Sequence, residues 1–108
     1  MKFLVSDIKA IMEGIAEKAS VSLSYGNFGK ISDFINQERN SNEVYITEDY
    51  LYKNMYRQIL RCEKDNEETL ALNRSFVNRI INRLGYKSFE EFKKAIKGRW
   101  DCLFINAK

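Results

Sequence analysis

The chain has 108 residues, of which 44% are hydrophobic and 31% are charged, so we expect a single domain with one buried core. It contains no proline and no histidine, and the lack of histidine removes the commonest general base and metal ligand of proteins. The net charge of +3 is uneven: residues 73–108 carry nine Lys/Arg against three Asp/Glu, whereas residues 1–72 carry nine against twelve.

Two helices are expected in the first third of the chain. The first starts near Ser6 or Asp7 and fades in the serine-rich residues 20–24. After a turn at residues 25–27, Asn27 is expected to cap a short second helix. Apolar residues at three- and four-residue steps define both helices: Ile8, Ile11, Met12, Ile15 and Ala19 in the first, and Phe28, Ile31, Phe34 and Ile35 in the second.

A third helix is expected after the polar loop of residues 38–43. Thr47 can cap it, and the following Glu48 and Asp49 suit the positive end of its dipole. Its apolar side is formed by Leu51, Met55, Ile59 and Cys62. Residues 44–46 are too short to assign as a strand, and residues 70–72 are expected to be a short apolar connector.

The fourth and fifth expected helices meet at a corner over residues 84–92. Asn73 caps the fourth helix, whose apolar face is Phe76, Val77, Ile80, Ile81 and Leu84. Gly85 is a natural helix stop because it has no Cβ to clash at positive φ. Ser88 and Glu91 form a capping-box pattern that starts the fifth helix after a turn of about three residues.

These elements predict an all-α fold of about five short helices in a compact bundle. We expect residues 1–98 to form the helical domain, and the apolar tail of residues 99–108 to be a closing strand or the start of a following domain. The expected core is Ile8, Ile11, Met12, Ile15, Phe28, Ile31, Phe34, Ile35, Leu51, Met55, Ile59, Phe76, Val77, Ile80, Ile81, Leu84, Phe89, Phe92 and Ile96.

Catalytic chemistry is poorly represented in the sequence. Without histidine there is no Ser–His or Cys–His pair, and Cys62 and Cys102 are too few for a structural zinc site. Adjacent acidic residues such as Glu90 and Glu91 point about 100° apart on a helix, so they do not converge on one substrate atom. We therefore expect no enzyme, no catalytic or metal-binding residue and no cofactor. The sequence shows neither a signal peptide nor a membrane span, so we expect a cytoplasmic protein with reduced thiols and no membrane partner.

The corner is a poor match to a DNA-reading helix–turn–helix. In such motifs a small residue stands four positions before the turn glycine, and apolar residues stand six and nine positions after it. Here those positions hold Ile81, Glu91 and Lys94. The register therefore favours a packing corner, and any reading surface is more consistent with the helix before Gly85.

Nucleic-acid binding is nevertheless the alternative that the basic residues 74–99 suggest. Polar and cationic side chains of this kind contact base edges and phosphates: Arg74, Asn78, Arg79, Asn82, Arg83, Lys87, Lys93, Lys94 and Lys97. An ordinary solvated face would carry the same residues. The tyrosines around the third helix could likewise stack on bases or pack half-buried at the rim of the core.

Residues 45–96 resemble a family of small helical modules often found at the N-terminus of larger bacterial regulatory or defence proteins. The resemblance rests on residues 46–47 with 50–52, and above all on Leu84-Gly85-Tyr86-Lys87-Ser88-Phe89-Glu90-Glu91-Phe92. A looser similarity links Gly85-Tyr86 and Phe92-Lys93-Lys94 to AraC-like regulators, although the spacing is shorter here and their DNA contacts do not transfer. Both resemblances imply an accessory, helix-turn-helix-like module without catalytic residues.

The leading functional hypothesis is thus a non-enzymatic interaction module that recruits a protein partner or self-associates. The apolar tail is its expected contact, through Trp100, Leu103 and Phe104. Nucleic-acid binding through residues 74–99 is the alternative.

Overall fold

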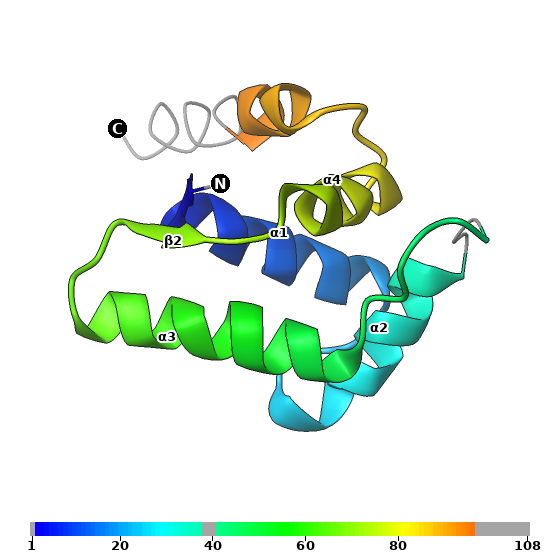
Figure 1. The fold of residues 1–108 in the computed structure, drawn as a ribbon, viewed down its shortest axis with the longest axis horizontal. Coiled ribbons are helices and arrows are strands. Elements are labelled where there is room, and N and C mark those ends of the chain that lie inside the picture. Colours follow the sequence, from blue (N-terminus) through cyan, green and yellow to red (C-terminus); the bar gives the residue numbers. More distant parts are fainter. Residues whose placement is uncertain (1, 38–40, 97–108) are drawn as a thin grey trace, which may run out of the picture.

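The computed structural model describes residues 2–37 and 41–96, most of them helical (Figure 1). Helix α1 (Val5–Lys18) crosses the middle of the molecule between α3 (Arg57–Lys64) and α4 (Arg74–Arg83). A 3₁₀ turn (Tyr25–Asn27) leads into α2 (Phe28–Asn36), and a π-helical segment (Tyr50–Tyr56) runs directly into α3. Residues 48–64 therefore form one continuous helical rod, and residues 89–96 form the last described helix.

A short antiparallel sheet corrects the all-α expectation. Strand β1 (Lys2–Leu4) pairs with β2 (Thr69–Ala71), and Phe3 stands opposite Leu70. Both of these central side chains are buried while their neighbours are exposed, which is the two-residue alternation of a half-buried strand. The prediction that residues 70–72 only connect helices was wrong, because residues 70 and 71 belong to β2. The pairing was missed because the partner strand β1 lies at the start of the sequence, far from β2 along the chain.

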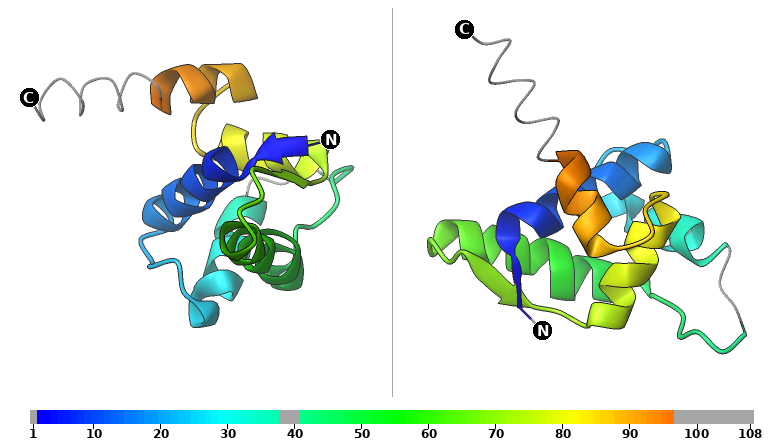
Figure 2. Two further views of the ribbon diagram at one scale, coloured as in Figure 1. Left: turned by 90° about the vertical axis from the view of Figure 1, so that its left-hand side faces the viewer. Right: turned by 90° about the horizontal axis from the view of Figure 1, so that it is seen from above.

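The predicted core is confirmed in its main part. Fourteen of the predicted residues are buried, and the remaining five (Phe34, Phe76, Leu84, Phe89 and Ile96) are partly buried against them. Several core residues come from short segments that the helical periodicity could not include: Phe3, Ile46, Leu70 and Leu72. Figure 2 shows β1 running into the start of α1 with β2 beside it, so the buried Phe3 and Leu70 of these strands add to the helical core at this end.

Three predicted helix caps can be compared with the structure. The side chains of Thr47 and Asn73 accept from the amides of Tyr50 (3.1 Å) and Phe76 (3.3 Å), as expected. Asn27 does not cap α2; its amide group instead donates to the Ser22 carbonyl (2.9 Å) and ties the preceding turn. Helix α1 begins at Val5, one residue earlier than predicted, because its first turn continues directly from β1.

The corner after α4 has the predicted signals with a longer connection. Gly85 has φ +101°, and the amides of Gly85 and Tyr86 donate back to Asn82 (3.0 Å) and Ile81 (3.2 Å), which is the Schellman ending of a helix. Ser88 accepts from the Glu91 amide at 3.2 Å. The connection spans residues 84–88 rather than about three residues.

Among residues 2–37 and 41–96, no helix has the length and apolar character needed to cross a membrane. The predicted tail of residues 99–108 lies outside the described residues, so the boundary at residue 98 remains a prediction.

Candidate functional site

A groove of about 610 Å³ separates the helical rod of residues 48–64 from β2 and the coil that follows it. The helix contributes one wall, formed by Tyr50, Asn54, Gln58 and Arg61. Steps of three and four residues bring these polar side chains to the same side of the rod. Its first half is the π-helical segment, a rare conformation that occurs frequently at functional sites. We refer to this hollow as the strand-edge groove.

The opposite wall is formed by the end of β2 and the residues that follow it, from Leu70 to Asn73. The amide of Val5 donates to the Glu68 carbonyl at 2.8 Å, so Glu68 faces β1. Because backbone groups alternate along a strand, Thr69 and Ala71 face the other way, toward the rod. The 3.8 Å approach of the Cys62 thiol to the Thr69 carbonyl agrees with this direction. The amide and carbonyl of Ala71 are thus left at the edge of the groove, outside the ladder with β1.

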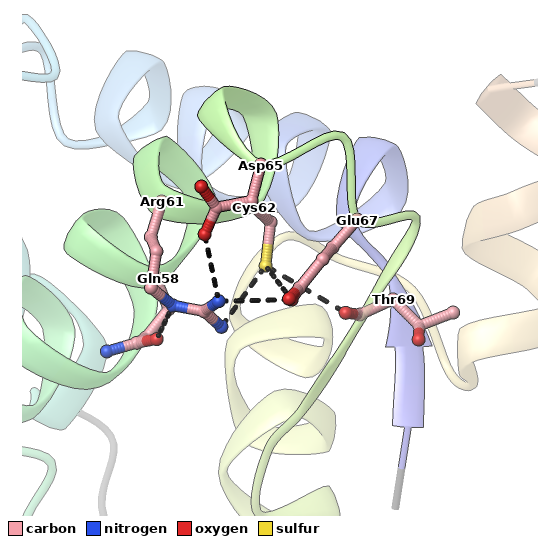
Figure 3. A network of polar contacts seen from close by, with 6 residues as sticks. All are labelled: Gln58, Arg61, Cys62, Asp65, Glu67 and Thr69. Atoms are coloured by element: carbon pink, nitrogen blue, oxygen red, sulfur yellow. Dashed lines mark hydrogen bonds and ion pairs between the residues drawn. The ribbon is translucent and has the colours of Figure 1, made fainter.

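A polar network closes one end of the groove (Figure 3). The guanidinium of Arg61 lies 3.0 Å from the Glu67 carboxylate and 3.7 Å from that of Asp65, and it donates to the Gln58 side chain at 2.8 Å. The hydrogen bond to Glu67 is the main cause of a raised pKa for Arg61, so the guanidinium stays charged. The two carboxylates outnumber this cation, so the network carries one net negative charge at this end of the groove.

Cys62 is buried beside this network. Its sulfur lies 3.7 Å from Glu67 Oε2 and receives a hydrogen bond from Arg61 at 3.6 Å. Burial raises the pKa of the Cys62 thiol, and this effect exceeds the lowering by Arg61. At neutral pH the group is therefore a thiol, whereas nucleophilic attack and metal ligation need the thiolate.

The groove does not combine groups for metal or covalent chemistry. No set of three or more His, Cys, Asp or Glu side chains in the described part of the chain is arranged to hold a metal ion. Its lining combines side-chain amides, the Tyr50 phenol that accepts from the Asn73 amide at 3.4 Å, the paired guanidinium of Arg61 and the backbone of Ala71. These are hydrogen-bonding groups suited to recognising another polar chain.

The structure places two of the predicted nucleic-acid-binding residues in internal contacts. Arg79 has a side chain only 10% exposed, pairs with Glu43 at 3.2 Å and donates to the Val44 carbonyl and to Asn36 Oδ1. Arg83 donates to the Phe34 carbonyl at 2.9 Å, and its guanidinium lies 3.9 Å from the centre of the Phe34 ring. Both arginines hold α4 against α2, and Arg79 also holds it against the loop before the rod.

The other predicted residues of this set are distributed over two elements. Lys93 pairs with Asp7 at 3.6 Å, and Asn78 is half-buried. Arg74 and Asn82 on α4, Lys87 in the corner and Lys94 on the last helix are exposed. Lys97 and the predicted partner-binding residues Trp100, Leu103 and Phe104 lie outside the described residues.

Sequence reasoning did not single out the strand-edge groove. The four-residue spacing of Tyr50, Asn54 and Gln58 is the signal that could have been used. The same spacing is normal for a solvated helix face, and only the unpredicted strand β2 turns that face into the wall of a groove.

No family model, curated protein or solved structure shows significant similarity to this chain. The resemblances to small bacterial helical modules and to AraC-like regulators therefore stay predictions.

Proposed function

We propose that this chain is a protein-interaction module that binds an extended segment of a partner protein in the strand-edge groove. The observation that carries the proposal is the free edge of β2, whose Ala71 amide and carbonyl face an open hollow. Addition of a strand to such an edge is a recurring mode of peptide recognition, because main-chain hydrogen bonds supply affinity without demanding a particular sequence.

The helical wall of the groove defines the chemistry of the partner. Asn54 offers a side-chain amide, which can donate to and accept from a peptide backbone or a polar side chain. The Gln58 amide already accepts from Arg61 at 2.8 Å and donates to the Lys53 carbonyl at 3.4 Å, so less of its hydrogen-bonding capacity is left for a partner. Arg61 is already paired with two carboxylates, Glu67 and Asp65, so a third carboxylate there would be repelled. We therefore expect an extended segment with uncharged polar side chains on the side that faces the rod.

The experiment uses the full chain to select binding peptides from a displayed random library. The site where each selected peptide binds is then mapped by changes in the amide chemical shifts of the chain. We expect the largest changes at Ala71, Asn54 and Gln58. Replacing Ala71 by proline removes the groove-facing amide but does not remove a hydrogen bond to β1. A strand tolerates proline at such an edge position. We expect Ala71→Pro to weaken binding at least about tenfold, since a main-chain hydrogen bond and close contact are lost.

Ala71→Ser is the matched control, because it changes the same exposed position and retains the amide. We expect it to bind like the unchanged chain. Selected peptides that shift amides elsewhere, or that bind Ala71→Pro and Ala71→Ser equally well, would contradict strand addition at this edge.

Nucleic-acid binding is a second proposal, supported by the exposed cations Arg74, Lys87 and Lys94. No ion pair or hydrogen bond to these three side chains is present among the described residues. It is the weaker proposal, because Arg79 and Arg83 already have partners within the chain.

A further inference from the structure

A second hollow, of about 360 Å³, lies where the turn before α2 meets the start of the helical rod. Its lining combines aromatic rings with carboxylates: Tyr25, Gly26, Phe28, Glu48, Asp49, Tyr52 and Lys53. It shares no lining residue with the strand-edge groove. We call it the Tyr25 corner.

Tyr25 is 74% exposed, an unusual position for an aromatic side chain in a defined turn. The turn that presents it is firmly tied. The side-chain amide of Asn27 donates to the Ser22 carbonyl (2.9 Å) and lies within 3.1 Å of the hydroxyls of Ser22 and Ser24. The Asn27 backbone amide adds a bond to the Ser24 carbonyl at 3.0 Å. The ring of Tyr25 is thus offered to solvent from a preorganised backbone.

The aromatic walls of this corner meet at nearly a right angle. The rings of Tyr25 and Tyr52 have centroids 4.8 Å apart and an interplanar angle of 83°. Behind them Phe28 lies 5.6 Å from Tyr52, and its burial fixes the position of that ring. In such an edge-to-face pair the positive edge of one ring lies on the negative face of the other, and both rings line the hollow. A ring face that the pair leaves open to the hollow attracts a cation.

Two carboxylates add negative charge to the same hollow. Glu48 Oε2 reaches to 3.0 Å from the place where a Cβ on Gly29 would stand, so the glycine lets this carboxylate approach the first turn of α2. Asp49 is paired with Lys53 only loosely, at 4.0 Å, with both side chains well exposed. Such a pair is weak in water and can be replaced by another cation. The two carboxylates and the ammonium group of Lys53 together give the hollow one net negative charge.

From these observations we propose that the Tyr25 corner binds a methylated ammonium group. Methyl groups on nitrogen make the cation large and poorly hydrated, so it gains contact with Tyr25 and Tyr52 at little cost in lost hydration. A primary ammonium is compact and strongly hydrated, and exposed carboxylates alone hold it weakly. A trimethylated lysine side chain and a choline group share the required chemistry.

The test titrates the full chain with three probes and follows the tyrosine ring resonances by NMR. The probes are a short peptide with trimethyllysine, the same peptide with unmodified lysine, and free choline. We expect the methylated peptide to bind about tenfold more tightly than the unmodified one. If the methylated peptide binds more tightly than choline, the natural ligand is a methylated side chain of a protein. If choline binds more tightly, the natural ligand is a choline-bearing molecule.

Variants connect this binding to the corner. Tyr25→Ala should weaken it about tenfold, and Tyr25→Phe should retain it, because the ring face and not the hydroxyl makes the contact. Tyr45→Ala is the matched control, since Tyr45 is also exposed but does not line this hollow. Circular dichroism confirms that each variant is folded. Equal binding of both peptides, no binding of either quaternary probe at about 10 mM, or unchanged binding in Tyr25→Ala would overturn the proposal. The proline variant of Ala71 should bind the probe normally, so the two proposals fail or succeed separately.

Discussion

Arg79 on α4 and Glu43 in the loop before the rod form an ion pair of 3.2 Å in which the arginine side chain is only 10% exposed. The same guanidinium donates to Asn36 of α2 at 3.1 Å. Asn36 in turn holds both the amide (3.0 Å) and the carbonyl (2.8 Å) of Ile46. One side chain therefore joins α4, α2 and the loop that leads into the helical rod.

Replacing Arg79 by alanine should destabilise the domain by about 2 kcal/mol, because a partly buried carboxylate and two acceptors lose their donor. The stability of Arg79→Lys should lie between that of the unchanged chain and that of Arg79→Ala, since lysine keeps the charge and loses the forked geometry. The measurement is urea unfolding followed by circular dichroism at 222 nm. Arg74→Ala is the control and should stay within about 0.5 kcal/mol, as usual for an exposed surface residue. Equal effects at the two positions would contradict the structural role of Arg79.

Gly85 is expected to resist substitution for a conformational reason. Its φ of +101° is strained for any residue with a Cβ, whereas the space itself is open, with Lys18 Nζ 3.6 Å away. Gly85→Ala should cost about 1 kcal/mol or more in unfolding free energy. Gly26→Ala is the matched control, because nothing lies within 4 Å of its Cβ position and its φ is not positive. Thermal unfolding of the two variants should show a lower midpoint for Gly85→Ala only.

The fold was predictable where the signal is local. The stop at Gly85, the caps at Thr47 and Asn73 and the three- and four-residue apolar steps each depend on neighbours within one turn. The pairing of Phe3 with Leu70 was not predictable in this way. Three-residue strands carry too little alternation to be recognised, and their partners are found only after the helices have packed.

The candidate sites depended on the same long-range packing. Arg79 and Arg83 look like a solvated basic face on a helical wheel, because a wheel does not show that α2 and residues 43–46 lie against it. Tyr25 and Tyr52 are far apart in the sequence, and neither carries a signal that they meet at a right angle. Composition suggested surface chemistry without saying where, and the three-dimensional arrangement shows which of these side chains lie together.

The Cys62 thiol gives a prediction about pH. Burial raises its pKa in the folded state, so above the ordinary thiol pKa of about 8.5 the unfolded chain loses this proton first. Stability from this group is therefore complete below about pH 8.5 and falls as the pH rises toward the folded pKa. Urea midpoints at pH 7.5 and pH 9.5 should differ more in the unchanged chain than in Cys62→Ala, with Cys102→Ser in both backgrounds. The same drop in both would show that other groups cause it.

Nucleic-acid binding can be tested without disturbing the fold by choosing cations to which no residue in the described part of the chain offers a hydrogen bond or an ion pair. A triple change of Arg74, Lys87 and Lys94 to glutamine removes three exposed positive charges and leaves the contacts of Arg79 and Arg83 intact. If these residues contact phosphates, the unchanged chain should shift labelled duplex or single-stranded DNA or RNA at about 50 mM salt, and the binding should fall steeply with salt. The triple variant should then bind more weakly with a shallower salt dependence, because fewer counterions are released. A control triple of Lys2, Lys9 and Lys30 to glutamine removes the same charge from other exposed positions. Equal loss of binding in both triple variants would mean that net charge alone attracts the nucleic acid. The absence of any shift at low salt would leave the protein-interaction proposal as the better supported of the two functions.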